Sequence, residues 1–295
     1  MTAQVISGTQ VAAEIRQEIA QQVKELKASK GVIPGLAVVL VGEDPASISY
    51  VTAKAKGSEE VGVHEETIRL PADISESDLL EKLAELNQDP RFHGILVQMP
   101  LPKHLDEKQI INNIAPEKDV DAFHPVNVGK LLIGEPDFLP CTPHGIMQLL
   151  TRSGNDPGGK HMVIVGRSNI VGKPLMAMMI QKAKGANATV TVVHTGTVDM
   201  AHYVREADIV IAAAGKAHVV TADMVKDGAV VIDVGVNRIP DASTKTGYRL
   251  VGDVDFEAVK EKAKAITPVP GGVGPMTVTM LLLNTVRAAE KAAGA

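Results

Sequence analysis

The sequence has little cysteine and few aromatic residues. Its 295 residues include one cysteine, Cys141, no tryptophan, and only 2% aromatic residues. A single cysteine excludes an intrachain disulfide and a cysteine-based zinc cluster, and it is typical of a reducing compartment. The scarcity of aromatic side chains also disfavours a stacking platform for nucleic-acid bases. We interpret Cys141 as a small buried residue rather than a reactive thiol.

Long runs of one residue class are missing as well. No stretch approaches the roughly eighteen apolar residues of a membrane span, and charged residues interrupt the first twenty positions, where a signal peptide needs an apolar core. There is no Lys/Arg tract, and the net charge is −5. We therefore expect a cytoplasmic, soluble protein that binds neither membranes nor nucleic acid, with no metal in its site.

The patterns that are present predict an α/β fold with two domains. Residues 9–27 have helical periodicity, and buried strands at 35–42, near 65–71 and near 92–102 alternate with helices at 50–61 and 75–89. The Ser-x-x-Asp signature at Ser75 predicts the start of the second of these helices. We assign residues 1–140, together with a C-terminal helix at 275–295, to a first domain.

A Pro/Gly-rich passage at 134–145 marks the boundary to a second domain, residues 141–274. Residues 160–197 follow the order strand, glycine loop, helix, strand, which is one mononucleotide-binding half of a Rossmann-like sheet. The segments ADIVIAAAG, GAVVIDVG and RLVGDV are expected to extend this sheet to at least four strands. The predicted second domain is thus a Rossmann-like nucleotide-binding domain.

The glycine loop VIVGRSNIVGKP departs from the G-x-G-x-x-G pattern, because Ser168 stands where a second glycine is expected. Gly166 would permit the tight turn, and Gly172 would let the helix approach the sheet. The amides of the first helical turn could hold a phosphate. The alternative is an ordinary strand-to-helix turn, which also tends to contain glycine.

The end of the second strand of this domain favours NADP over NAD. An NAD site usually has an acid there for the ribose hydroxyl, whereas His194 and Thr195 occupy that place. Arg167, in the glycine loop, could pair with the 2′-phosphate of NADP.

Two further features need an explanation. Tyr50 and Lys54 are four residues apart and would share one face of a helix, yet they precede the glycine loop by over a hundred residues, unlike the Tyr-x-x-x-Lys pair of short-chain dehydrogenases. The segment ITPVPGGVGPMTV combines glycines and prolines before an apolar helix, which suits either close approach to a ligand or a domain hinge.

Several segments together closely resemble one enzyme family over nearly the whole chain: YVTAKAK, GILVQMPLP, KDVDAFHPVNVG, CTPHGI, GRSNIVGKP and TPVPGGVGPMTV. That family is the bifunctional methylenetetrahydrofolate dehydrogenase/methenyltetrahydrofolate cyclohydrolase. The resemblance implies an N-terminal catalytic domain, an NADP-binding Rossmann domain, a C-terminal helix returning to the first domain, and a homodimer. It also implies tetrahydrofolate derivatives as substrates, bound in a cleft between the domains, and a place in one-carbon metabolism and purine biosynthesis.

The resemblance implies roles for individual residues as well. The catalytic group would be Lys54, Tyr50, Gln98 and Asp121, with Tyr50, Gln98 and Asp121 also binding the folate together with Pro270, Gly271 and Gly272. A desolvated, partly neutral Lys54 would act in the hydrolytic step, next to the uncharged Gln98. The cofactor residues would be Gly166, Arg167, Ser168, Gly172, His194, Thr195, Gly215 and Ile232.

Other interpretations stay open at this point. Lys54 could be a solvated helix lysine, and Asp121 could merely cap a turn together with Asp119. The enzyme could be a monofunctional dehydrogenase in which Lys54 only positions the substrate. A non-catalytic NADP-binding sensor would bind the dinucleotide and be indifferent to loss of Lys54.

Overall fold

The computed structural model describes residues 2–244 and 247–294. The chain divides into two compact units: unit 1 comprises residues 1–12 and 142–277, and unit 2 comprises residues 13–141 and 278–295. The predicted α/β class is confirmed. The sequence placed residues 1–12 in the first domain, but β1 (Gln4–Val5) pairs with β11 (Ala265–Ile266) and so belongs to unit 1. Helix α1 (Gly8–Lys30) begins in unit 1 and continues in unit 2.

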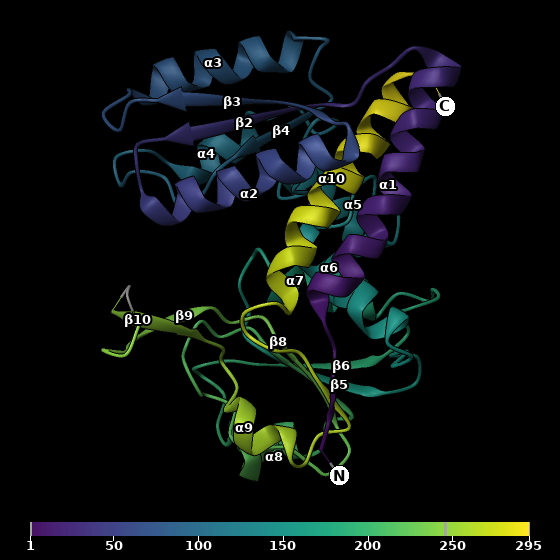
Figure 1. Ribbon diagram of the computed structural model, residues 1–295, viewed down its shortest axis with the longest axis vertical. Coiled ribbons are helices and arrows are strands. Elements are labelled where there is room, and N and C mark those ends of the chain that lie inside the picture. Colours follow the sequence, from purple (N-terminus) through teal and green to yellow (C-terminus); the bar gives the residue numbers. More distant parts are fainter. Residues whose placement is uncertain (1, 245–246, 295) are drawn as a thin grey trace. The chain divides into compact units, whose positions relative to one another are not determined.

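Unit 2 is built on a three-stranded parallel sheet in the order β3-β2-β4. Its strands are β2 (Gly35–Val41), β3 (His64–Leu70) and β4 (Gly94–Val97). The central β2 is buried along its whole length because both of its faces are covered. Figure 1 shows α2 (Pro45–Val61) on one side of this sheet and α3 (Glu76–Gln88) on the other. The unit also contains α4 (Glu107–Asn112) and α5 (Pro125–Ile133).

The helix starts in unit 2 follow local capping chemistry. The predicted start of α3 is confirmed, since the Ser75 hydroxyl accepts the Asp78 N–H at 3.1 Å. Helix α2 begins at Pro45, earlier than the predicted Tyr50, because the Asp44 carboxylate accepts the Ser47 N–H at 2.8 Å. The proline at the first helical position needs no hydrogen-bond partner.

Unit 1 contains a six-stranded parallel sheet in the order β1-β11-β8-β7-β5-β6. The central strands are β5 (His161–Val165), β6 (Thr189–Val193), β7 (Ile209–Ala212) and β8 (Val230–Asp233). The chain moves from β5 outward to β6 and then returns to place β7 on the other side of β5. The direction of winding therefore reverses between β5 and β7, where open α/β sheets bind their ligands.

The remaining elements of unit 1 are short apart from α6. They are α6 (Cys141–Arg152), α7 (Gly172–Met179), α8 (Met200–Arg205), η1 (Ala222–Met224) and α9 (Phe256–Lys260). Residues from the strands, from α8 and α9 and from the loops form an aliphatic core that includes Val163, Val210 and Val231. This agrees with a composition that offers few aromatic side chains.

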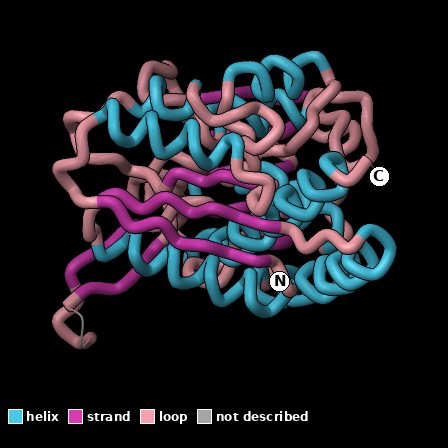
Figure 2. Tube along the Cα trace, turned by 90° about the horizontal axis from the view of Figure 1, so that it is seen from above, coloured by secondary structure: helices cyan, strands magenta, loops and turns pink. Residues whose placement is uncertain are grey.

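The segment RLVGDV was wrongly predicted to extend this sheet. Its strand β10 (Tyr248–Val251) pairs antiparallel with β9 (Asn237–Pro240) in a separate two-stranded ribbon. Figures 1 and 2 show this hairpin projecting from its own unit. This segment cannot pair with β8 on that side because β11 already does so. It pairs with β9 instead, and the Asp241 N–H donates to the Gly247 carbonyl between the two strands.

Helix α10 (Val273–Ala292) carries the chain back to unit 2 from Val278 onward. The amide of Asn284 donates to the carbonyls of Val120 and Leu139, each at 2.8 Å. These bonds bind the helix to the loop between α4 and α5 and to the segment between α5 and α6, as predicted for a C-terminal helix returning to the first domain. Among the described residues, no helix combines the length and apolar character that a membrane crossing requires.

Candidate active site

Lys54 is buried in unit 2, with 7% of its surface exposed. Its Nζ donates a hydrogen bond to Oε1 of Gln98 at 2.8 Å. Gln98 directly follows β4, and its Nε2 donates to the Met99 carbonyl at 2.7 Å. This second bond holds the amide with its oxygen toward Lys54, so the amine has a neutral partner. Lys54 is therefore not a solvated helix lysine.

The surroundings of Lys54 favour its neutral form. Burial lowers the pKa of the amine, and the negative charges of Asp121 and Glu65 act in the opposite direction. Burial also raises the pKa of Glu65, whose carboxylate accepts hydrogen bonds from the hydroxyls of Ser58, at 2.8 Å, and Thr67, at 3.2 Å. The amine and the carboxylates are thus a coupled group in a partly dehydrated environment.

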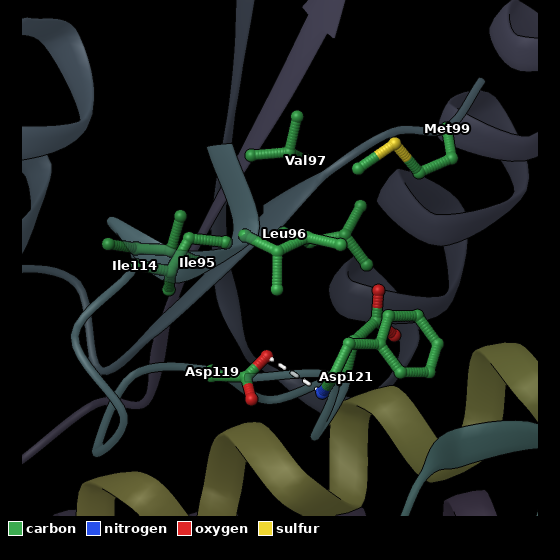
Figure 3. A pocket seen from close by; sticks show the side chains of 9 residues that line it. Ile95, Leu96, Val97, Met99, Ile114, Asp119 and Asp121 are labelled. Carbon is green, nitrogen blue, oxygen red and sulfur yellow. Dashed lines mark hydrogen bonds between the residues drawn. The ribbon is translucent and has the colours of Figure 1, made fainter. Parts of the chain in front are cut away.

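Asp119 and Asp121 lie in the loop between α4 and α5, and they have different surroundings. Asp119 is 1% exposed, and its carboxylate accepts the N–H groups of Phe123 and His124 and the side-chain amide of Asn127, at 3.2, 2.8 and 2.8 Å. Asp119 therefore anchors the loop. Asp121 lines a pocket together with Asp119 and Phe123 (Figure 3). Burial raises the pKa of Asp121 to about 6, although the charge of Lys54 opposes the rise.

Tyr50 lies one turn before Lys54 on α2, and 47% of its surface is exposed. Its phenol ring is therefore available to contact a ligand, in contrast to the buried amine. Cys141 is buried, as expected, and its thiol donates to the Val120 carbonyl at 3.4 Å. Burial raises the pKa of this thiol, which agrees with a structural rather than a reactive role.

The glycine loop of unit 1 connects β5 to α7. Gly166 has a φ of +132°, and a Cβ atom there would lie 2.1 Å from the Ala213 carbonyl oxygen. A Cβ at Gly172 would lie 2.2 Å from the oxygen of Gly166, so this glycine packs against the loop itself. The hydroxyl of Ser168 accepts the Val171 and Gly172 N–H groups, at 3.1 and 3.4 Å, and holds the loop in shape.

Arg167 and His194 come together at the ends of neighbouring strands, with Nη1 of the arginine 3.3 Å from Nε2 of the histidine. Nδ1 of His194 accepts the Gly196 N–H at 3.1 Å, which leaves Nε2 directed at the guanidinium. The guanidinium and the imidazole can both donate hydrogen bonds, so together they could bind an anion placed beside them. Thr195 is exposed next to His194.

The other sequence-predicted residues of unit 1 have different exposures. Gly215 follows β7 with a φ of +66°, and a Cβ atom there would meet nothing within 4 Å. Ile232 is 0% exposed in the middle of the sheet. Pro270, Gly271 and Gly272 form the turn before α10, where the Gly271 carbonyl accepts the Thr9 N–H at 3.1 Å. These three belong to unit 1, whereas Lys54, Gln98 and Asp121 belong to unit 2.

Sequence reasoning missed Asp233 and Asp253, which the structure buries almost completely, at 2% and 0% exposure. The only signal is the position of an acid just after a short strand in VVIDVG and RLVGDV. Within residues 2–244 and 247–294, no group of three or more histidine, cysteine or acidic side chains could hold a metal ion.

Comparison with known proteins decides the family. The catalytic-domain model of the tetrahydrofolate dehydrogenase/cyclohydrolase family matches residues 6–121, and the NAD(P)-binding-domain model of the same family matches residues 140–293. The chain belongs to this family. The family predicted from the sequence is thereby confirmed. Together with the relatives described next, the match confirms the bifunctional enzyme activity and the NADP cofactor, and the monofunctional alternative is not favoured.

Relatives of the tetrahydrofolate dehydrogenase/cyclohydrolase family match along their full length. The bifunctional protein FolD of Syntrophus aciditrophicus is 60% identical, and the match covers 100% of both chains. The solved FolD structure from Campylobacter jejuni has a TM-score of 0.92 at 46% identity and covers 98% of this chain and 99% of that one. The Trypanosoma brucei enzyme, solved with NADP and an inhibitor, has a TM-score of 0.94 at 42% identity, with 100% coverage of both chains.

Proposed function

We propose that this chain oxidises 5,10-methylenetetrahydrofolate to 5,10-methenyltetrahydrofolate with NADP and then hydrolyses that product to 10-formyltetrahydrofolate. The observation that carries this proposal is the buried amine of Lys54, hydrogen-bonded to the neutral amide of Gln98 in the unit that the catalytic-domain model matches. When bound, NADP supplies the hydride acceptor. The residues of this chain bind and orient the folate and move protons.

Lys54 acts in the hydrolytic step. The neutral amine takes a proton from water as the oxygen bonds to the methenyl carbon. The resulting adduct then loses its hydroxyl proton while its carbon–nitrogen bond to N5 breaks and N5 gains a proton, a transfer that the same amine can mediate. One proton is released to water overall. The uncharged Gln98 supports this role, because its amide orients the amine without stabilising the ammonium form.

Asp121 and Tyr50 bind the pterin. The edge of the pterin ring carries two donors, its amino group and a ring N–H. An ionised carboxylate can accept hydrogen bonds from both. The exposed phenol of Tyr50 packs on the ring from the same helix that carries Lys54. The oxidation step removes a hydride and needs no enzyme base, so these contacts contribute by fixing geometry.

Arg167, His194 and Thr195 bind the 2′-phosphate of NADP. The chemistry of the site fits this group, because a guanidinium and an imidazole converge where an NAD site would present an acid. Gly166, Ser168 and Gly172 shape the loop that would hold the diphosphate, and the backbone at Gly166 and Gly172 leaves no room for a side chain. As the family resemblance implies, Ile232 would lie on the nicotinamide side and Gly215 would let the dinucleotide pass close to the backbone. Pro270, Gly271 and Gly272 would contact the folate.

We extend the proposal to the setting of the enzyme. The family resemblance supports a homodimer. The single, buried cysteine supports a location in the cytoplasm, which is a reducing compartment. The product is a formyl donor, which supports a role in purine biosynthesis. Light scattering on the purified protein measures its molar mass and so tests the dimer. Cell fractionation tests whether the protein is in the cytoplasm. Deletion of the gene tests the purine requirement.

One assay tests the two activities. The protein is supplied with 5,10-methylenetetrahydrofolate and either NADP or NAD, while the reduced cofactor and the methenyl absorbance are followed separately. Formation of NADPH with little methenyl accumulation is the expected result. Accumulation of the methenyl compound would contradict the hydrolytic activity, and no reduction of either cofactor would contradict the oxidation.

A further inference from the structure

A backbone loop of unit 1 lies where the winding of its sheet reverses. Residues 213–215 follow β7, and the glycine loop follows the neighbouring β5. The two loops touch, because a Cβ atom at Gly166 would lie 2.1 Å from the Ala213 carbonyl oxygen. Ligands of doubly wound sheets bind outside the carboxyl ends of the strands at this point. The shape of the 213–215 loop therefore bears directly on the cofactor site.

A distant carboxylate holds this loop. Asp253 is 0% exposed, and its Oδ2 accepts the N–H groups of Ala214, at 2.6 Å, and Gly215, at 2.8 Å. Its Oδ1 accepts the side-chain amide of Asn237 at 2.9 Å. The loop amides are thus directed into the protein, while the position of a Cβ on Gly215 is open, with nothing within 4 Å. The arrangement therefore leaves open space beside Gly215.

Asp253 is itself held by a second buried carboxylate at the end of β8. Oδ1 of Asp233 accepts the N–H groups of Gly235 and Asp253, at 3.0 and 2.9 Å, and its Oδ2 accepts that of Val254 at 3.0 Å. A Cβ at Gly252 would lie 1.8 Å from Oδ2 of Asp233, and a Cβ at Gly235 would lie 2.0 Å from Oδ1 of Asp253. The two carboxylates therefore join the ends of β7 and β8 through fixed contacts.

Such a pair is costly for stability alone. Removing a carboxylate from water carries a free-energy penalty, and burial raises the pKa of Asp233 to about 7 despite its three backbone donors. In return, the pair fixes the conformation of a loop whose amides would otherwise be free to turn.

We propose that Asp253 is a positioning residue for the nicotinamide dinucleotide: by binding the amides of Ala214 and Gly215, it holds the loop after β7 in the shape that admits the cofactor. This inference rests on the proposed function. It predicts that Asp253 governs cofactor affinity without contributing to the hydrolytic step, whose residues lie in unit 2.

The test compares Asp253→Ala with the conservative Asp253→Asn. We expect the alanine variant to raise the KM for NADP at least tenfold, because the N–H groups of Ala214 and Gly215 lose the oxygen that accepts both of them. The asparagine retains one oxygen for the two amides and can donate to a rotated Asn237 amide, so it should remain within about threefold of the wild type. Hydrolysis of methenyltetrahydrofolate without cofactor should be unchanged in both. Asp223→Ala, which removes an exposed carboxylate of the same unit, is the matched control.

The outcomes separate the inference from the proposed function. An unchanged KM for NADP in Asp253→Ala, or a parallel loss of hydrolysis and cofactor affinity in folded protein, would overturn the positioning role. If that variant does not fold, Asn237→Ala removes only the contact to Oδ1, and a severalfold rise in the KM for NADP supports the role whereas no change overturns it. Failure of the wild type to reduce NADP would instead overturn the proposed function.

Discussion

Nζ of Lys54 and Oε1 of Gln98 lie 2.8 Å apart, joined by a hydrogen bond between a buried amine and a neutral amide. The pairing matters because the partner of a buried lysine decides its charge. A carboxylate would stabilise the ammonium, whereas an amide orients the amine and leaves burial to lower its pKa.

Gln98→Glu should abolish most of the hydrolysis. The new carboxylate would hold Lys54 as an ammonium that cannot accept a proton, and we expect a loss of roughly 100-fold at neutral pH, within the usual contribution of a general base. Hydride transfer should decrease less. The measurement is the rate of methenyltetrahydrofolate hydrolysis from pH 6 to pH 10. A variant whose hydrolysis stays at the wild-type rate would contradict the charge argument.

Lys54→Met should eliminate hydrolysis while leaving measurable NADPH formation, since only the hydrolytic step needs the amine. The methionine keeps an unbranched apolar chain in the buried site. Lys56→Met is the matched control, because Lys56 is exposed on the same helix. We expect it to retain both activities. Equal hydrolysis by the two variants would remove Lys54 from the mechanism.

Much of this site was predictable from local sequence, and some of the fold was not. Short-range periodicity and turn chemistry predict the face shared by Tyr50 and Lys54, the strand that Gln98 directly follows and the glycine loop at Gly166. Their functional roles came from the family resemblance, because spacing alone could not distinguish a buried Lys54 from a solvated one.

Non-local pairing explains what local patterns missed. Strand β1 joins the sheet of unit 1 by pairing with β11, over 250 residues away, and no local pattern in a two-residue strand specifies that partner. The same limit explains why RLVGDV was assigned to the wrong sheet. Asp253 was missed because its partners, Ala214 and Asn237, become its neighbours only in the folded chain.

Arg167→Ala should weaken binding of NADP more than binding of NAD. The alanine variant would lose the charge-assisted hydrogen bonds from the guanidinium to the 2′-phosphate. These bonds are worth about 1.5–3 kcal/mol, or roughly tenfold to a hundredfold in affinity for NADP. NAD lacks this phosphate and should change little. Isothermal titration with each cofactor measures the ratio, and Arg205→Ala, an exposed arginine of the same unit, is the control. Equal losses for both cofactors would place Arg167 away from the phosphate.

Folate binding should weaken in acid. The pKa of Asp121 is raised to about 6, so this carboxylate becomes protonated as the pH falls through that value. The protonated carboxyl group accepts fewer hydrogen bonds, and its O–H faces the N–H donors of the pterin ring. We expect the KM for 5,10-methylenetetrahydrofolate to rise below about pH 6 in the wild type. Asp121→Asn should have a high KM that depends little on pH, and a wild-type KM that is constant from pH 5 to pH 8 would refute the assignment.

The same carboxylate should reduce the stability of the fold. Because the pKa of Asp121 is about 6 in the folded chain, above its ordinary value of 3.8, the folded state binds the proton more tightly than the unfolded state does. The free energy of unfolding therefore falls as the pH rises from about 4 to 6 and stays lower above that range, by about 1–3 kcal/mol. Asp121→Asn removes this titration, so it should melt at a higher temperature than the wild type at pH 8, with a difference that shrinks toward pH 4. Thermal denaturation of both proteins at pH 5 and pH 8 measures the effect, and a variant that melts lower than the wild type at pH 8 would show that the ionised carboxylate stabilises the fold.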